Sequence, residues 1–124
     1  MSELIYKEEA YEIVGICMEV HNELGPGLLE AIYKAAIEWE VDSRSIPYER
    51  EKGYPVYYKG HLLQKKYNAD FVLHEKIILE VKAKVCLTDQ DIAQTINYMR
   101  ISGCKLGLLI NFGKNKLEIK RLVY

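Results

Sequence analysis

Three charged residues interrupt a segment that otherwise has the composition of buried β-strands. They are Asp70, Glu80 and Lys82, in the stretch YNADFVLHEKIILEVKAK. Strand alternation places all three on one face, and a turn that leaves Leu73 opposite Ile77 pairs Asp70 directly with Glu80. Side chains opposed in this way lie about 5 Å apart at Cβ, and two like charges there destabilise a sheet unless a cation lies between them.

A divalent cation would remove this repulsion. Mg²⁺, with Mn²⁺ as its substitute, prefers carboxylate oxygens and keeps bound waters that can attack a phosphodiester. Lys82 would then position such a water or help to deprotonate it. The alternative is an ordinary surface ion triad in which Lys82 pairs with both acids, and for charges on an arbitrary β-meander this is the commoner arrangement. Spacing alone does not establish catalysis.

The same residues resemble the bipartite signature of the PD-(D/E)XK nuclease superfamily, with an acid at Asp70 and the acid-x-Lys element at 80–82. A more specific resemblance is to the GxxExxY family, whose motif is present as GLLEAIY at residues 27–33. Nearly the whole chain resembles that family, in blocks that follow its order: HNELGPGLLEAIY, YYKGHLLQKKYNADFVL, ILEVKA, AQTINYM and GLLINFG. Alanine precedes Asp70 where the superfamily name has proline, a frequent departure.

The resemblance implies an activity and a set of roles. It implies a nuclease that depends on Mg²⁺ or Mn²⁺ and hydrolyses phosphodiester bonds of nucleic acid, either DNA or RNA, of which we favour DNA. Asp70 and Glu80 would bind the metal, and the carbonyl of Val81 would add a ligand. Lys82 would orient the attacking water or stabilise charge. The rival interpretation is a catalytically inactive module on the nuclease scaffold, which binds nucleic acid or a protein partner.

Two predicted helices carry further candidates. Glu30 resembles the helical acid that completes the metal site in several such nucleases, although a first-turn glutamate with Lys34 four residues later is favourable without any metal. Tyr33 either packs with a hydrogen-bonded hydroxyl or reaches a phosphate. Gln94 and Tyr98 resemble the Q-x-x-x-Y motif of RecB-type nucleases, in which the glutamine lies near the metal; without the resemblance, a solvent-facing pair is expected.

Nucleic-acid contacts are expected to be local. Seventeen basic against eighteen acidic residues give a net charge of -1, which excludes a general basic field. Lys59, Lys65 and Lys66 lie among tyrosines in YYKGHLLQKKY, a basic and aromatic patch able to contact a phosphate backbone. A solvated hairpin explains this patch equally well. The small size of the chain makes a homodimer or a larger complex plausible.

The sequence contains no apolar run of about eighteen residues and no signal-peptide pattern, so we predict a cytoplasmic protein without a membrane span. Three cysteines are far apart in apolar surroundings and are predicted to be core thiols rather than metal ligands or disulfide partners: Cys17, Cys86 and Cys104. His21 lies on the apolar face of the first helix, and we expect it to be buried and hydrogen-bonded to the neighbouring Gly-Pro-Gly turn.

The periodicity predicts a single α/β domain over residues 1–124 with the order ααβββαββ. The first helix is expected over about 8–24, and the second from Pro26 to about Ser43, with a buried apolar stripe: Leu28, Leu29, Ile32, Ala36 and Trp39. A three-stranded meander follows, then a helix with a Thr88–Asp91 cap and a Gly103 stop, then two strands. The resemblance implies the restriction-endonuclease-like fold, with a central mixed sheet and flanking helices.

Overall fold

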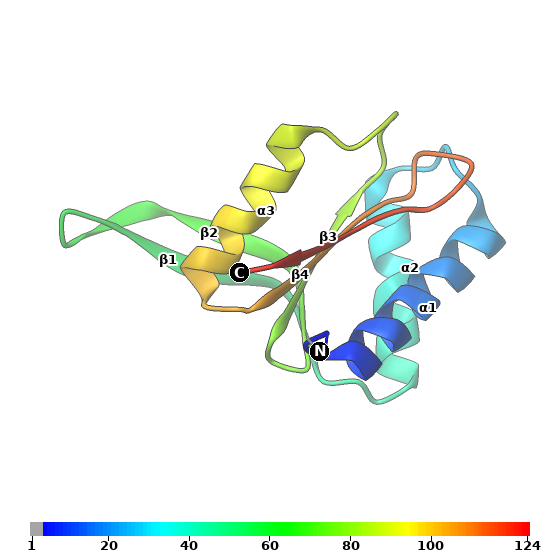
Figure 1. Cartoon of the computed structure of the whole chain (residues 1–124), viewed down its shortest axis with the longest axis horizontal. Coiled ribbons are helices and arrows are strands. Elements are labelled where there is room, and N and C mark those ends of the chain that lie inside the picture. The colour runs from blue at the N-terminus through cyan, green and yellow to red at the C-terminus, as the bar shows by residue number, and fades with distance from the viewer. Residues whose placement is uncertain (1–3) are drawn as a thin grey trace.

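The computed structural model describes residues 4–124, in which a five-stranded sheet separates two layers of helix. Helices α1 (Lys7–Leu24) and α2 (Glu30–Ser43) cover one face, and α3 (Asp89–Ser102) lies on the other (Figure 1). The strands are β1 (Tyr48–Tyr58), β2 (His61–Leu73), β3 (Ile77–Lys82), β4 (Leu106–Asn111) and β5 (Glu118–Val123). Within the described residues, no helix is long and apolar enough to cross a membrane.

The sheet is mixed, and its spatial order follows the chain from β1 to β5. The first three strands form the predicted antiparallel meander. Strand β4 pairs parallel to β3, with α3 as the crossover, and β5 closes the sheet as an antiparallel edge. All six residues of β4 are buried, as their continuous apolar run predicts for an interior strand. The element order and the restriction-endonuclease-like α/β fold are therefore confirmed.

Hydrophobic side chains form one core on each face of the sheet. The larger core packs α1 and α2 against alternate residues of β3, namely Ile77, Leu79 and Val81. The smaller core lies under α3 and contains Ile78 of the same strand. Because β3 contributes to both cores, Glu80 within it lies at the centre of the molecule and is buried.

Helix α3 forms as the sequence predicts, because its end signals are local. The Thr88 side chain accepts a hydrogen bond from the Asp91 backbone, and the Asp91 carboxylate accepts one from the Thr88 backbone, which completes a capping box. At the other end, Gly103 adopts a left-handed conformation with φ of 79°. Both predicted helix-end signals are confirmed.

Helix α2 corrects two predictions. It begins at Glu30 rather than at Pro26, and it buries the face that carries Tyr33, Ile37 and Val41. The predicted stripe is largely exposed: Leu28, Leu29, Ile32 and Trp39. Both stripes are apolar at helical spacing, and docking against the sheet buried the one that the sequence pattern did not favour.

The buried polar and sulfur groups differ from prediction in two respects. His21 is buried as expected, but its Nε2 lies 2.8 Å from the Lys114 carbonyl oxygen instead of bonding to the Gly-Pro-Gly turn. Cys17 and Cys104 are buried free thiols, whereas Cys86 is exposed in the connection from β3 to α3. A run of apolar letters around Cys86 thus belongs to a surface loop.

Candidate metal site between two strands

The site forms where β2 and β3 part. Their backbone pairing ends at Phe71–Leu79, one residue before the predicted Asp70–Glu80 pair. Side-chain alternation in β2 also breaks here, because Ala69 packs under α3 whereas Phe71 packs under α1 and α2. Regular strand alternation would place Ala69 and Phe71 on one face, and here they lie on opposite faces. The neighbouring strand is irregular at the same level: Glu51 has φ of 53° and forms no pair with Asp70.

Asp70 and Glu80 interlock across the gap. The Asp70 N–H donates to Glu80 Oε2 at 2.9 Å, and the Val81 N–H donates to Asp70 Oδ2 at 2.8 Å. Tyr67 donates its hydroxyl to Glu80 Oε1 at 3.2 Å. Where β2 and β3 separate, the N–H groups of Asp70 and Val81 have no carbonyl acceptor on the opposite strand. A carboxylate accepts from each of them instead, which keeps the two acids close although the backbone pairing has ended.

The two acids face different layers. Asp70 contacts Lys34 on α2, whereas Glu80 contacts Tyr67, which belongs to the core under α3. Lys82 follows Glu80 at the strand period and shares its face. The predicted common face is thus correct for Glu80 and Lys82 and wrong for Asp70, because the irregular backbone at Glu51 and Asp70 turns the Asp70 side chain toward α2.

Glu80 has a strongly perturbed acidity. Burial, followed by the negative charge of Asp70, raises the pKa of Glu80 to about 8, against hydrogen bonds from the Asp70 N–H and the Tyr67 hydroxyl that favour the anion. With only protein groups around it, Glu80 therefore holds a proton near neutral pH. A buried acid that stays protonated beside a second acid is a site at which an added cation is strongly favoured.

Lys34 is the site residue that sequence reasoning did not assign. Its Nζ lies 2.8 Å from Asp70 Oδ1, 3.0 Å from Glu30 Oε2 and 3.8 Å from Glu51 Oε1, and 12% of its side chain is exposed. Burial alone would lower the pKa of Lys34, but hydrogen bonds to Asp70 and Glu30 outweigh it and raise the pKa. In the sequence, the four-residue spacing predicts the Glu30–Lys34 pair, but it does not predict the contact of Lys34 with Asp70.

The donor set fits a hard divalent cation. Two carboxylates meet beside the Val81 backbone. The Lys82 carbonyl accepts from the Phe112 N–H at 2.8 Å, so the Lys82 backbone faces β4. Because successive residues of a strand face opposite edges, the N–H and the carbonyl of Val81 both face β2 and the two acids. Mg²⁺ is commonly held by one or two carboxylates while it keeps several waters. Over residues 4–124, no three His, Cys, Asp or Glu side chains gather to hold a metal, so Glu30 as a third ligand stays a prediction.

Tyr98 and Gln94 lie one turn apart on α3. Tyr98 stacks on Tyr67 with ring centroids 3.6 Å apart, and Tyr67 in turn stacks on Tyr54 of β1. Burial, and then the charges of Glu80 and Asp70, raise the pKa of Tyr98. Tyr98 is therefore half-buried beside the acids rather than facing solvent. Gln94 is half-buried as well, and the roles predicted for both residues stay predictions.

Tyr33 has a structural role. It is fully buried, its hydroxyl donates to the Gly25 carbonyl oxygen at 2.5 Å, and it accepts from the Leu28 N–H at 3.1 Å. Its ring stacks on Phe112 with centroids 4.7 Å apart. The packing interpretation of Tyr33 is therefore correct. Contact with a phosphate is not, because both functions of the hydroxyl are engaged inside the Gly-Pro-Gly turn.

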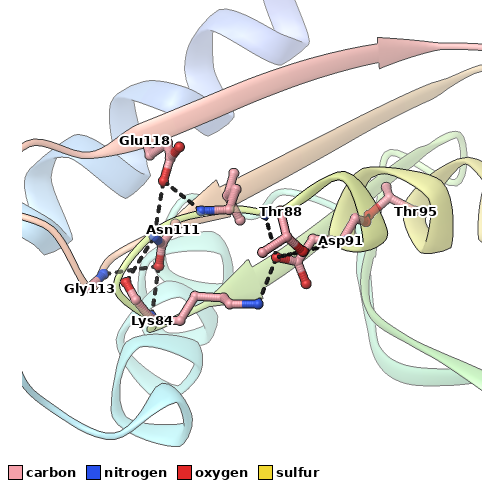
Figure 2. A network of polar contacts seen from close by, with 8 residues as sticks. Lys84, Thr88, Asp91, Thr95, Asn111, Gly113 and Glu118 are labelled. Atoms are coloured by element: carbon pink, nitrogen blue, oxygen red, sulfur yellow. Dashed lines mark hydrogen bonds and ion pairs between the residues drawn. The ribbon is translucent and has the colours of Figure 1, made fainter.

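A polar network fixes the connection that follows Lys82 (Figure 2). Asn111 accepts from the Lys84 N–H at 2.9 Å and donates to the Lys84 carbonyl at 3.0 Å and to Glu118 at 3.1 Å. Lys84 Nζ reaches the carboxylate of Asp91, in the first turn of α3, at 2.8 Å. The end of β3 and the beginning of α3 are thus tied to β4 and β5, which sets the position of α3 beside Glu80.

The fold and the site define a class of protein, an α/β domain with an acid on one strand and Glu-x-Lys on the next. The model of the PD-(D/E)XK nuclease superfamily matches residues 7–122, and the chain belongs to that superfamily. Among solved structures, the crystal structure of SSO0001 is similar in fold, with a TM-score of 0.58 and 17% sequence identity over 95% of this chain and 59% of that one. This chain therefore spans about three-fifths of that relative. No curated protein matches the chain.

Proposed function

We propose that this protein is a nuclease that depends on Mg²⁺ or Mn²⁺ and hydrolyses phosphodiester bonds of DNA, with Asp70 and Glu80 as its metal ligands. The observation that carries the proposal is the interlocked pair of acids, one of which is buried with a pKa of about 8. Membership in the PD-(D/E)XK nuclease superfamily supports it. When bound, the metal supplies a Lewis acid and a more acidic water.

The direct test is cleavage by the purified protein. Linear and circular DNA, single-stranded DNA and RNA are incubated with Mg²⁺ or Mn²⁺, with EDTA as the control. We expect cleavage of DNA that EDTA abolishes. A protein that cleaves none of these substrates and binds neither ion by calorimetry would contradict the proposal.

Lys82 is proposed to orient the attacking water or to stabilise charge on the phosphate. It is half-buried on the Glu80 face. A Lys82→Met variant should lose at least about 100-fold in cleavage rate, the usual contribution of a positioned proton-transfer or charge-stabilising group, while it still binds Mn²⁺. The exposed Lys120 on β5 offers the matched control Lys120→Met. Equal loss in both variants would show that only overall charge matters.

The hairpin arm, residues 54–67, is proposed as a substrate-binding element. It extends β1 and β2 away from the rest of the sheet (Figure 1). Lys59, Lys65 and Lys66 are exposed on it, and the segment contains no acidic residue. Its exposed aromatic side chains include Tyr57 and Tyr58, at 63% and 60% exposure. Lysines interspersed with aromatic rings suit contacts to phosphates and to bases.

Replacement of all three arm lysines by glutamine should weaken DNA binding by at least about tenfold and flatten its salt dependence by about two to three in log–log slope. Fluorescence anisotropy at several salt concentrations measures both. The matched control replaces Lys114, Lys116 and Lys120, which belong to the other lysine-rich segment. Equal weakening by the two triple variants would mean that the arm has no special role.

Within the superfamily, we propose assignment to the GxxExxY group. Each named position of the motif has a distinct physical role in this chain. Gly27 has φ of 98°, a conformation suited to glycine. Glu30 opens α2 and pairs with Lys34, and Tyr33 anchors the turn that precedes the helix. The motif therefore joins the end of α1 to the candidate site.

A second candidate is a non-catalytic module that binds nucleic acid or a protein. One observation favours it: Lys34 already supplies a positive charge to Asp70. Metal binding distinguishes the candidates, because the catalytic proposal requires a cation between Asp70 and Glu80 and the non-catalytic one does not.

A further inference from the structure

We propose that Lys34 is an exchangeable counter-ion of the metal site, which holds Asp70 while the site is empty of metal and moves away from it when a divalent cation binds. The proposal rests on the proposed function, because it concerns the same two ligands. It adds a role for a lysine on α2, outside both the acid-x-Lys element and the GxxExxY motif.

All four oxygens have protein partners. Glu80 Oε1 and Oε2 accept from the Tyr67 hydroxyl and the Asp70 N–H, and Asp70 Oδ2 accepts from the Val81 N–H. Once Glu80 is deprotonated, these three donors leave the second lone pair of each oxygen open, because each supplies a single hydrogen bond. The fourth oxygen, Asp70 Oδ1, is held instead by the full positive charge of Lys34 at 2.8 Å.

An ammonium and a divalent cation cannot share the same side of one carboxylate oxygen without strong repulsion. The Lys34 ammonium has only 12% of its side chain exposed, so solvent screens this repulsion weakly. A metal that binds Asp70 through Oδ1 therefore requires that the Lys34–Asp70 contact break, and a metal that binds through Oδ2 favours a longer contact, because the two cations lie on one carboxylate.

Lys34 has other acids to which it can turn. Glu30 Oε2 lies 3.0 Å from its Nζ and Glu51 Oε1 lies 3.8 Å away. Both acids are more exposed than Asp70, with side-chain exposures of 42% and 52% against 15%. The ammonium can thus leave Asp70 without becoming an unpaired charge, and no backbone movement is needed.

Lys34 therefore affects the stability of the metal-free protein and its affinity for metal in opposite directions. Lys34 stabilises the metal-free fold, because it neutralises an acid that sits beside a second acid. It also weakens metal binding by the free energy of the contact that must be broken. A chain without this lysine should therefore bind metal more tightly and be less stable in the absence of metal.

The test is Mn²⁺ binding by isothermal titration calorimetry to the full chain and to Lys34→Met, Lys34→Arg and Lys76→Met. Lys76→Met is the matched control, since Lys76 pairs with Glu9 on the surface and its replacement removes the same charge away from the site. We expect Lys34→Met to bind Mn²⁺ at least about tenfold more tightly, which corresponds to release of one charge-assisted contact. Lys34→Arg and Lys76→Met should stay within about threefold of the natural chain.

The outcomes separate this proposal from the proposed function. If the natural chain binds Mn²⁺ and Lys34→Met binds it equally or more weakly, the role of Lys34 is overturned and the metal site stands. If neither binds, both are overturned. Should Lys34→Met fail to fold, the NMR signal of the Lys34 ¹³Cε group in the natural chain answers the same question. The Lys34 signal should shift on Mg²⁺ saturation. If the amide signals of Asp70 and Val81 shift while the Lys34 signal stays unchanged, the proposed role of Lys34 is overturned.

Discussion

An Asp70→Asn variant is expected to lose metal-dependent DNA cleavage by at least about 10³-fold while it remains folded. A metal ligand supplies several kcal/mol of transition-state stabilisation, and about 1.4 kcal/mol corresponds to each power of ten in rate. Asparagine can still accept the Val81 hydrogen bond through its carbonyl oxygen, and Lys34 keeps its contact with Glu30. The loss should therefore reflect chemistry and not the fold.

The measurement combines cleavage rates, Mn²⁺ calorimetry and thermal unfolding in EDTA. Asp42→Asn is the matched control, because Asp42 is exposed near the end of α2. We expect Mn²⁺ binding to be lost along with cleavage in Asp70→Asn and both to be unchanged in the control. An Asp70→Asn protein that cuts within a few-fold of the natural rate would refute the assignment of Asp70.

The second large effect concerns stability without metal. Glu80→Gln should stabilise the metal-free protein, and the gain should grow from about pH 4.5 to about pH 8. The folded pKa of Glu80 is raised to about 8 from an ordinary value of 4.5, so the folded chain keeps a proton that the unfolded chain has released. Stability of the natural chain therefore falls as pH rises through this window, by at most about 1.4 kcal/mol per pH unit. Glutamine mimics the protonated acid and removes this loss.

Urea unfolding in EDTA at pH 5, 6.5 and 8.5 measures the difference between the two chains. Glu118→Gln is a control of opposite sign, because the Asn111 hydrogen bond, against a smaller effect of burial, lowers the pKa of Glu118. That variant should lose stability above the ordinary glutamate pKa. Saturating Mg²⁺ should reverse the order at pH 8.5, since only the natural chain gains stability from bound metal. A Glu80→Gln protein less stable than the natural chain at pH 8.5 in EDTA would show that the buried acid is not destabilising.

The sequence predicted correctly those features that depend on residues close together in the chain. The Thr88–Asp91 cap and the Gly103 stop lie within a few residues of the helix ends that they define, and both are correct. The approach of Asp70 to Glu80 followed from hairpin register, which the intervening turn sets. These features need no knowledge of distant parts of the chain.

Tertiary contacts determined the features that the sequence did not reveal. Lys34 meets Asp70 only because α2 docks beside the point where β2 leaves β3. The Asp70 side chain faces α2 because the neighbouring strand is irregular at Glu51, and no sequence pattern predicts the positive φ of Glu51. On α2 two apolar stripes competed, and packing on the sheet buried the face of Tyr33 and Ile37. Helix-to-sheet docking thus decided the contact of Lys34 and the buried face of α2, and an irregular neighbouring strand decided the direction of Asp70.

We expect Asp70 and Glu80 to bind a divalent cation together. A crystal of the natural chain soaked in Mn²⁺ tests it most directly, through anomalous difference density. We expect a peak within bonding distance of one oxygen of each carboxylate and near the Val81 carbonyl, with the Lys34 ammonium moved away from Asp70 Oδ1. Well-ordered Asp70 and Glu80 side chains with no anomalous peak between them, and with the Lys34–Asp70 contact intact at saturating Mn²⁺, would contradict it.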